Sequence, residues 1–154
     1  MAELSKFIIF KLHDQPFGVN VKQVISIERM QEITQVPRTS DFIKGVTYIR
    51  EETTPVIDLR ERLLMDEKEP TESSRILVVQ IKEMQIGLIV DAATDVKDIE
   101  QEAIEPAPPI VGGVKETFVH GVANLEERLL ILLDLETIID PKETNELQEI
   151  VEVE

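Results

Sequence analysis

The sequence predicts a mainly β protein built from two similar halves, with short helices between some of the strands. Two observations lead to this fold class: short strand-forming runs alternate with turn residues, and the same motifs occur twice in the same order. The chain has 154 residues, so each half alone has too few residues for a strong core. We therefore expect the halves to pack together as one domain, residues 1–154, with a groove between them.

The first half begins with a predicted hairpin. Residues 7–12 are rich in β-forming side chains, residues 13–16 supply turn formers, and residues 17–21 alternate apolar and polar side chains. The same signals predict further strands at 46–49, 54–57, 76–81, 86–90, 119–123 and 129–133. Short strands at this spacing are typical of barrels or sandwiches.

An internal repeat organises these strands. Residues 45–51 align with 121–127, and the same register places 55–59 on 131–135. Each copy reads as strand, tight turn, strand, and then an Asp-Leu pair that opens a helix, at 60–64 and 136–139. Asp58 and Asp134 are the expected N-caps, because a short carboxylate can accept the free N–H groups of a first helical turn.

A second pair of hairpins supports the duplication. Residues 10–21 align with 79–90, and the register continues so that Val24 falls on Ala93 and Ile27 on Val96. The halves are expected at 5–65 and 74–140, joined by the polar stretch 66–73.

Two segments fall outside the repeated hairpins. The proline-rich stretch 104–109 is expected to be extended, and Gly112 and Gly113 allow a turn after it. The acidic tail, residues 141–154, is expected to be a solvated helix or a disordered end.

Composition argues against several functions. The net charge of −15 repels nucleic-acid phosphates and anionic lipids, and it favours solubility. We expect no secretory signal, and no apolar run reaches the ~18 residues that a membrane span needs. The absence of cysteine excludes disulfides and thiolate chemistry, and it fits a reducing compartment.

Catalytic motifs are missing as well. There are two histidines, no Gly-x-Ser-x-Gly elbow and no Walker loop. Asp91, Asp95 and Asp98 lack the spacing of a calcium loop, and the simpler reading is that Asp91 ends a strand while the others face water. We expect no metal, no cofactor and no enzyme activity. The alternatives are a hydrolase with a carboxylate pair in the groove, or a small-ligand sensor with a closed apolar cavity.

Aliphatic side chains at equivalent places in the two halves are the first candidates for a partner surface. Val24 and Ile27 follow the second strand of the first half, and Ala93 and Val96 hold the equivalent places in the second half. Core packing is the alternative for each. Arg50 is expected to be exposed in a hairpin, where the alternative role is an ion pair with Glu51 or Glu52.

Four motifs in this order resemble the CheW-like family of chemotaxis coupling proteins. They are FIKGVTYIR at 42–50 with PVIDL at 55–59, GLIVD at 87–91 with Asp95 and Val96, IEPAP at 104–108, and Gly121-Val122 with LILLDL at 130–135. The resemblance covers residues 6–139. It implies two SH3-like five-stranded β-barrel subdomains and a non-catalytic adaptor. Such adaptors couple the cytoplasmic tips of methyl-accepting chemoreceptors to the histidine kinase CheA, in arrays on the inner face of the membrane.

The resemblance also assigns contact positions. Receptor contact is expected in the groove, and kinase contact on the first barrel at Ile33 and Thr53. A second, ring-forming contact of the kinase-binding set is expected on the second barrel near Glu105 and Ile110. The receptor-binding positions are Val24, Ile27, Arg50, Ile76, Gly87, Ala93 and Val96.

This chain departs from the family at the hairpin. The family has Asn-Leu-Arg-Gly where this chain has Tyr48-Ile49-Arg50-Glu51. Glycine permits positive φ, so we expect Glu51 to alter the turn. The polar run 52–54 replaces an apolar stretch, which predicts a weaker kinase contact or a divergent coupling protein. The coupling domain of CheV-like proteins is the related alternative.

Overall fold

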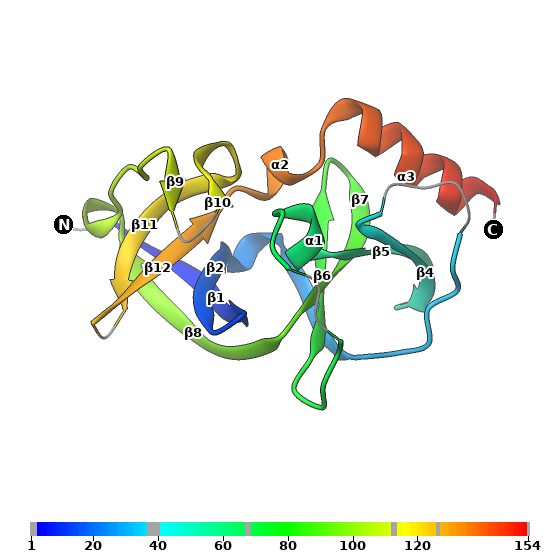
Figure 1. Ribbon diagram of the computed structural model, residues 1–154, viewed down its shortest axis with the longest axis horizontal. Coiled ribbons are helices and arrows are strands. Elements are labelled where there is room, and N and C mark those ends of the chain that lie inside the picture. The colour runs from blue at the N-terminus through cyan, green and yellow to red at the C-terminus, as the bar shows by residue number, and fades with distance from the viewer. Residues whose placement is uncertain (1–2, 37–40, 67–68, 112–113, 126, 154) are drawn as a thin grey trace.

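Strands dominate the computed structural model, which describes residues 3–36, 41–66, 69–111, 114–125 and 127–153 (Figure 1). The strands are β1 (Leu4–Leu12), β2 (Gln15–Asn20), β3 (Val24–Arg29), β4 (Ile43–Ile49), β5 (Glu52–Asp58), β6 (Arg75–Ile81), β7 (Met84–Val90), β8 (Ala92–Glu100), β9 (Ile110–Val111), β10 (Val114–Lys115), β11 (Val119–Leu125) and β12 (Arg128–Leu133). The helices are α1 (Leu59–Arg62), α2 (Leu135–Ile138) and α3 (Pro141–Val153), and the 3-10 turns are η1 (Val21–Gln23), η2 (Gln101–Ala103) and η3 (Glu116–Phe118).

Two five-stranded sheets carry the fold. Sheet A has the strand order β11-β12-β2-β1-β8, and sheet B has the order β3-β6-β7-β5-β4. The short pair β9-β10 lies apart from both sheets. A mainly β architecture with two five-stranded subdomains is therefore confirmed.

The sheets do not follow the two halves of the sequence. Hairpin β1-β2 pairs with β8 and β12, whereas hairpin β6-β7 pairs with β3 and β5. Each repeat thus gives its first hairpin to the sheet that holds the later strands of the other repeat. The boundaries 5–65 and 74–140 describe the repeat in the sequence, and they do not separate the two sheets.

The repeat itself is reproduced in three dimensions. The parallel pairing of β5 with β7 matches the parallel pairing of β12 with β2. Gly45 and Gly121 hold equivalent places where another segment crosses closely: a Cβ on Gly45 would lie 2.0 Å from the Thr34 carbonyl oxygen, and one on Gly121 would lie 2.6 Å from the Ile104 side chain. The two glycines are therefore required by close approach in both copies.

One core joins the two sheets. Phe10 and Phe17 of sheet A stack with ring centroids 5.8 Å apart, and they belong to the same buried cluster as Leu77 and Leu88 of sheet B. The expectation that the halves pack together agrees with this shared cluster.

Helix α1 and helix α2 begin as predicted. Asp58 accepts a hydrogen bond from Arg60 N at 3.0 Å, and Asp134 accepts one from Glu136 N at 3.1 Å. Both carboxylates are the N-caps of their helices.

The acidic tail is a helix, which was one of the two expectations, but it is not solvated on all sides. It forms α3, whose start is fixed by reciprocal bonds between Asp140 and Glu143, 3.0 and 2.8 Å long. Leu147 and Ile150 are buried, with exposed fractions of 0% and 5%. The helix therefore packs on the protein through an apolar side.

The hairpin between β4 and β5 also differs from expectation. Arg50 has φ of 52° and Glu51 has φ of 66°, so the turn keeps the left-handed backbone that the family's glycine would favour. Glu51 adopts this conformation and does not change the turn. Residues 104–109 lie between η2 and β9, where Glu105 bridges to Val122. Gly112 and Gly113 lie outside the described residues.

Candidate functional site

The end strands of the two sheets carry exposed aliphatic side chains. Within the described residues, β3 pairs only with β6, and β8 pairs only with β1. Ile27 on β3 is 44% exposed and Val96 on β8 is 46% exposed. Both side chains are available to a partner, because β-strands turn alternate residues to opposite faces and these two face away from the core.

Two other predicted receptor positions, Val24 and Ala93, are less exposed than Ile27 and Val96. Val24 and Ala93 are half-buried and pack against the main core cluster. The two residues have similar surroundings, as expected from the repeat, which aligns Val24 with Ala93. They support the strands that carry Ile27 and Val96, and they expose less surface of their own.

Two further predicted receptor positions are core residues. Ile76 is fully buried, and Gly87 on the neighbouring strand is buried as well. A Cβ on Gly87 would lie 2.8 Å from Ile76 Cγ2, so Ile76 fills the space that the glycine leaves. Neither residue presents a side chain to a partner in this structure, because Ile76 is buried and Gly87 has no side chain. Their part in receptor binding stays a prediction, and it would act through sheet B, where β6 and β7 follow β3 in the strand order.

Arg50 is exposed at the tip of the β4–β5 hairpin, as expected. The described residues show no ion pair between Arg50 and Glu51 or Glu52. Its guanidinium is thus open to solvent on this hairpin.

Of the predicted kinase positions of the first barrel, Thr53 lies on β5 of sheet B, and Ile33 lies between β3 and β4. Ile33 is half-buried and packs against a small cluster that contains Ile49 and Val56. Thr53 on β5 is half-buried and lines a hollow of about 300 Å³. Gln148 and Val151 of α3 line the same hollow. Sequence reasoning did not assign α3 to this surface, although the i, i+3 spacing of Leu147 and Ile150 is a helical signal.

The predicted positions of the ring-forming contact, Glu105 and Ile110, lie at and just before β9. Ile110 on β9 is 66% exposed. Glu105 is exposed and lines an open depression of about 680 Å³, together with Asp134, Glu136 and His120. Asp134 is occupied as the N-cap of α2, and Glu136 is exposed. This depression offers no buried carboxylate pair, so the hydrolase alternative has no support, and it is not a closed apolar cavity.

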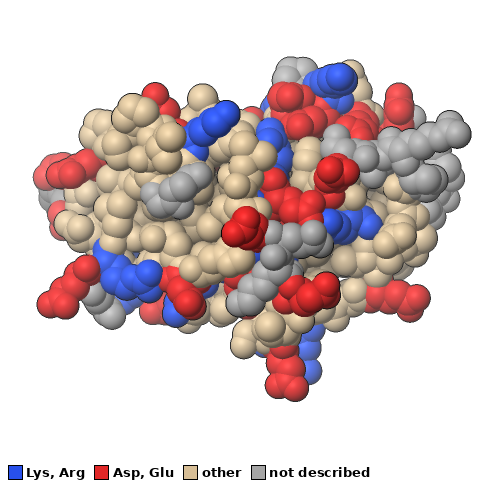
Figure 2. Space-filling model, in the orientation of Figure 1, with Lys and Arg blue, Asp and Glu red and all other residues tan. Residues whose placement is uncertain are grey.

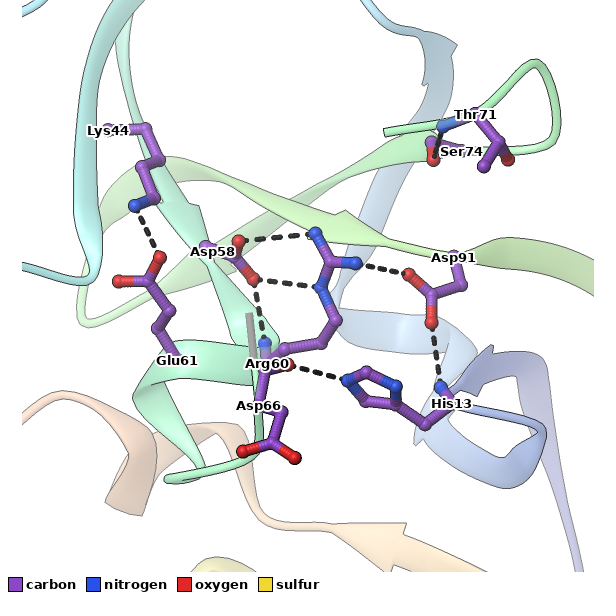
Figure 3. Close-up of polar contacts among 9 residues, drawn as sticks. All are labelled: His13, Lys44, Asp58, Arg60, Glu61, Asp66, Thr71, Ser74 and Asp91. Atoms are coloured by element: carbon purple, nitrogen blue, oxygen red, sulfur yellow. Dashed lines mark hydrogen bonds and ion pairs between the residues drawn. The ribbon is translucent and has the colours of Figure 1, made fainter. Parts of the chain in front are cut away.

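A buried cluster of charges is the feature that sequence reasoning missed (Figure 3). Arg60 is 1% exposed and lies between Asp58, 3.2 Å from its Nη2, and Asp91, 2.9 Å from its Nη1. Asp58 and Arg60 are neighbours in sequence, but Asp91 is 31 residues from Arg60, so local sequence gives no signal for the contact that completes the cluster.

The three aspartates weighed as a calcium site do not converge. Asp91 is taken up by Arg60, whereas Asp98 pairs with Lys6 at 3.6 Å and Asp95 with Lys97 at 3.8 Å. Asp91 follows β7 directly, as the simpler reading had it, and it faces the protein. No group of three potential ligands that could hold a metal occurs among the residues that the structure describes.

One face of the molecule carries many acidic side chains (Figure 2). Figure 2 shows more acidic than basic side chains on one face, with acidic groups prominent in its right half. This distribution agrees with the net charge of −15. A partner that approaches this face gains from carrying basic residues.

Two joined β subdomains whose end strands expose aliphatic side chains define an interaction module. Residues 6–143 match the model of the CheW-like domain. The chain belongs to the CheW-like family.

Named relatives agree with this membership. The chain is 36% identical to the chemotaxis protein CheW of Bacillus subtilis (strain 168) over 136 residues, 88% of this chain and 87% of that protein. It is 32% identical to the chemotaxis protein CheW of Klebsiella aerogenes over 139 residues, 90% of this chain and 84% of that one. The crystal structure of the scaffolding protein TtCheW from Thermoanaerobacter tengcongensis superposes with a TM-score of 0.84 at 31% identity, covering 93% of this chain and 92% of that chain.

The chain is thus a chemotaxis coupling adaptor of this family. In the part of the chain that the structure describes, no helix is both long enough and apolar enough to cross a membrane.

Proposed function

We propose that this protein is a non-catalytic adaptor that binds the cytoplasmic tips of methyl-accepting chemoreceptors and the histidine kinase CheA at the same time. The single observation that carries the proposal is the pair of exposed aliphatic side chains, Ile27 and Val96, on the end strands of the two sheets. A receptor tip that contacts both end strands engages both subdomains at once.

The receptor surface is centred on Ile27 and Val96 and includes the exposed Arg50 hairpin. Val24 and Ala93 support it from below, and Ile76 with Gly87 sets the shape of the neighbouring sheet. Apolar side chains that are roughly half exposed retain area that a partner can bury, at about 25 cal/mol per Å².

The kinase surface is proposed on sheet B, around Ile33 and Thr53. The polar run 52–54 lies here, yet Met84 and Val151 also line the hollow beside Thr53. These side chains supply apolar area that the hairpin itself lacks, so α3 contributes to the same surface. The second, ring-forming contact is proposed at Glu105 and Ile110, which stand exposed on the other subdomain.

Both binding events place the protein at receptor arrays on the inner face of the membrane. It raises the local concentration of the kinase at receptors without any chemistry of its own.

Reconstitution from purified parts tests the proposal. The protein is mixed with a receptor cytoplasmic fragment and CheA, and both complex formation and kinase autophosphorylation are measured. We expect a ternary complex and a rise in kinase activity that needs all three components. Binding to neither partner would refute the proposal, and binding to the receptor alone would refute the assigned kinase surface.

A further inference from the structure

Asp91 stands at the point where the chain passes from one sheet to the other. It is the one residue between β7 of sheet B and β8 of sheet A. Its backbone N–H donates to the Lys11 carbonyl at 3.0 Å, and its Oδ2 accepts from His13 N at 2.7 Å. Both contacts tie Asp91 to hairpin β1-β2 of sheet A.

The other carboxylate oxygen of Asp91 is tied to the opposite sheet. Oδ1 accepts from Arg60 Nη1 at 2.9 Å, and Arg60 lies on α1, which follows β5 without a gap. Asp58, the last residue of β5, receives the rest of the guanidinium through Nε at 3.3 Å and Nη2 at 3.2 Å. Figure 3 shows Arg60 between the two carboxylates, with His13 beyond Asp91.

The side chain of His13 adds a contact to the segment that follows α1. Its Nε2 lies 2.6 Å from the carbonyl oxygen of Asp66, and a carbonyl can only accept, so Nε2–H is the donor. The β1–β2 turn is thereby held to the chain that follows α1.

A buried arginine between two aspartates is weak evidence for a role in stability. Removing charges from water is costly, and apolar replacements of buried ionic groups are often as stable as the original. Arg60 is 1% exposed and the Asp58 and Asp91 side chains are 4% and 13% exposed, so this desolvation applies to all three. Such groups are retained in some proteins because they specify one geometry.

The repeat supplies an internal comparison. In the second copy, Asp134 holds the place of Asp58 and caps its helix in the same way, but Glu136 stands where Arg60 would be. Glu136 is exposed, and its contact is with Gln23 at 3.5 Å. The Asp-Leu-helix turn therefore forms without a buried arginine.

We infer that Asp58, Arg60 and Asp91 form an inter-sheet latch, a set of positioning residues that fixes β8 relative to β5. The inference rests on the proposed function, because β8 carries Val96 of the receptor surface and β5 carries Thr53 of the kinase surface. A displacement of β8 by a bound receptor reaches β5 through three charged side chains in direct contact. The latch transmits the signal and touches neither partner.

The decisive variant removes the charges and keeps the volume, Asp58→Asn with Arg60→Met and Asp91→Asn. The matched control is Asp98→Asn, which breaks the solvent-exposed pair with Lys6 on the same strand. Thermal unfolding, the separate dissociation constants for receptor fragment and CheA, and receptor-dependent kinase activity are measured for each protein.

We expect the latch variant to fold and to bind each partner alone within about threefold of wild type, while receptor-dependent kinase activation falls at least tenfold. The control should match wild type in every measurement. Full activation by the latch variant would overturn the inference, as would an equal loss of activation in the control. If the triple variant does not fold, Asp91→Asn alone leaves Arg60 paired with Asp58, and a selective loss of activation of about threefold or more is required of it.

The two proposals fail in different ways. Wild-type protein that binds neither partner refutes the proposed function. Wild-type protein that couples normally, together with a latch variant that also couples normally, refutes the latch alone.

Discussion

Replacing Val96 by aspartate should weaken receptor binding strongly and leave the fold intact. Full burial of a valine side chain is worth about 1.5–3 kcal/mol, and Val96 is 46% exposed. About half of that burial remains available to a partner, which gives ~1 kcal/mol. An unpaired carboxylate in a dry contact costs a further ~1–3 kcal/mol.

The sum, about 2–4 kcal/mol, corresponds to a loss of affinity of roughly 30- to 1,000-fold. Stability should change little, since substitutions of exposed residues away from structural features usually stay within about 0.5 kcal/mol, with up to ~1 kcal/mol for strand propensity.

Titration of a receptor cytoplasmic fragment against wild type and variant measures this effect, with thermal unfolding run in parallel. Leu129→Asp is the matched control, because Leu129 is 40% exposed on β12 and lies outside the proposed receptor surface. Unchanged receptor affinity for a folded Val96→Asp protein would refute the assignment of β8 to the receptor. An equal loss in the Leu129 variant would show that added charge, and not the surface, is responsible.

Three further predictions concern the scaffold that holds these surfaces. Gly45→Ala should abolish folding or cost well over ~4 kcal/mol, because the new Cβ would meet the Thr34 carbonyl oxygen at 2.0 Å with φ at 141°; soluble, folded Gly45→Ala protein in a denaturant titration would contradict this. Leu147→Ala should lower the free energy of unfolding by about 2–5 kcal/mol, since this leucine of α3 is fully buried, and a change below 1 kcal/mol in the same titration would mean that α3 does not pack in solution. Glu51→Gly should raise stability by up to ~1 kcal/mol, because it relieves a left-handed φ of 66°; a lower melting temperature for the variant would argue against the turn described.

Local patterns predicted the hairpins and the repeat well. Alternating side chains, turn residues and the Asp-Leu pair each act over a few residues, so β1, β2 and the caps Asp58 and Asp134 could be read from the sequence. Strands β3 and β8 were missed as strands, although their aliphatic positions were picked out. Their exposed faces mix polar and apolar residues, so the alternation that marks a half-buried strand is weak in them.

Non-local features escaped prediction for a physical reason. The exchange of hairpins depends on which strand edges meet, and the pairing of Arg60 with Asp91 joins segments 31 residues apart. Ile76 and Gly87 were carried over as receptor positions, and the sequence did not reveal that both are buried. Ile27 and Val96 are exposed, and their contact with the receptor stays a prediction until receptor binding is measured.

The exchanged hairpins also bear on how such a chain could arise. A single-repeat ancestor would have lacked partners for its own first hairpin, and two copies that traded hairpins would have supplied them to each other. Joining the two copies head to tail then requires only a connector such as the stretch between α1 and β6. Cleavage of the present chain in that stretch should give two fragments that stay associated, because each retains a hairpin on which the other's sheet depends.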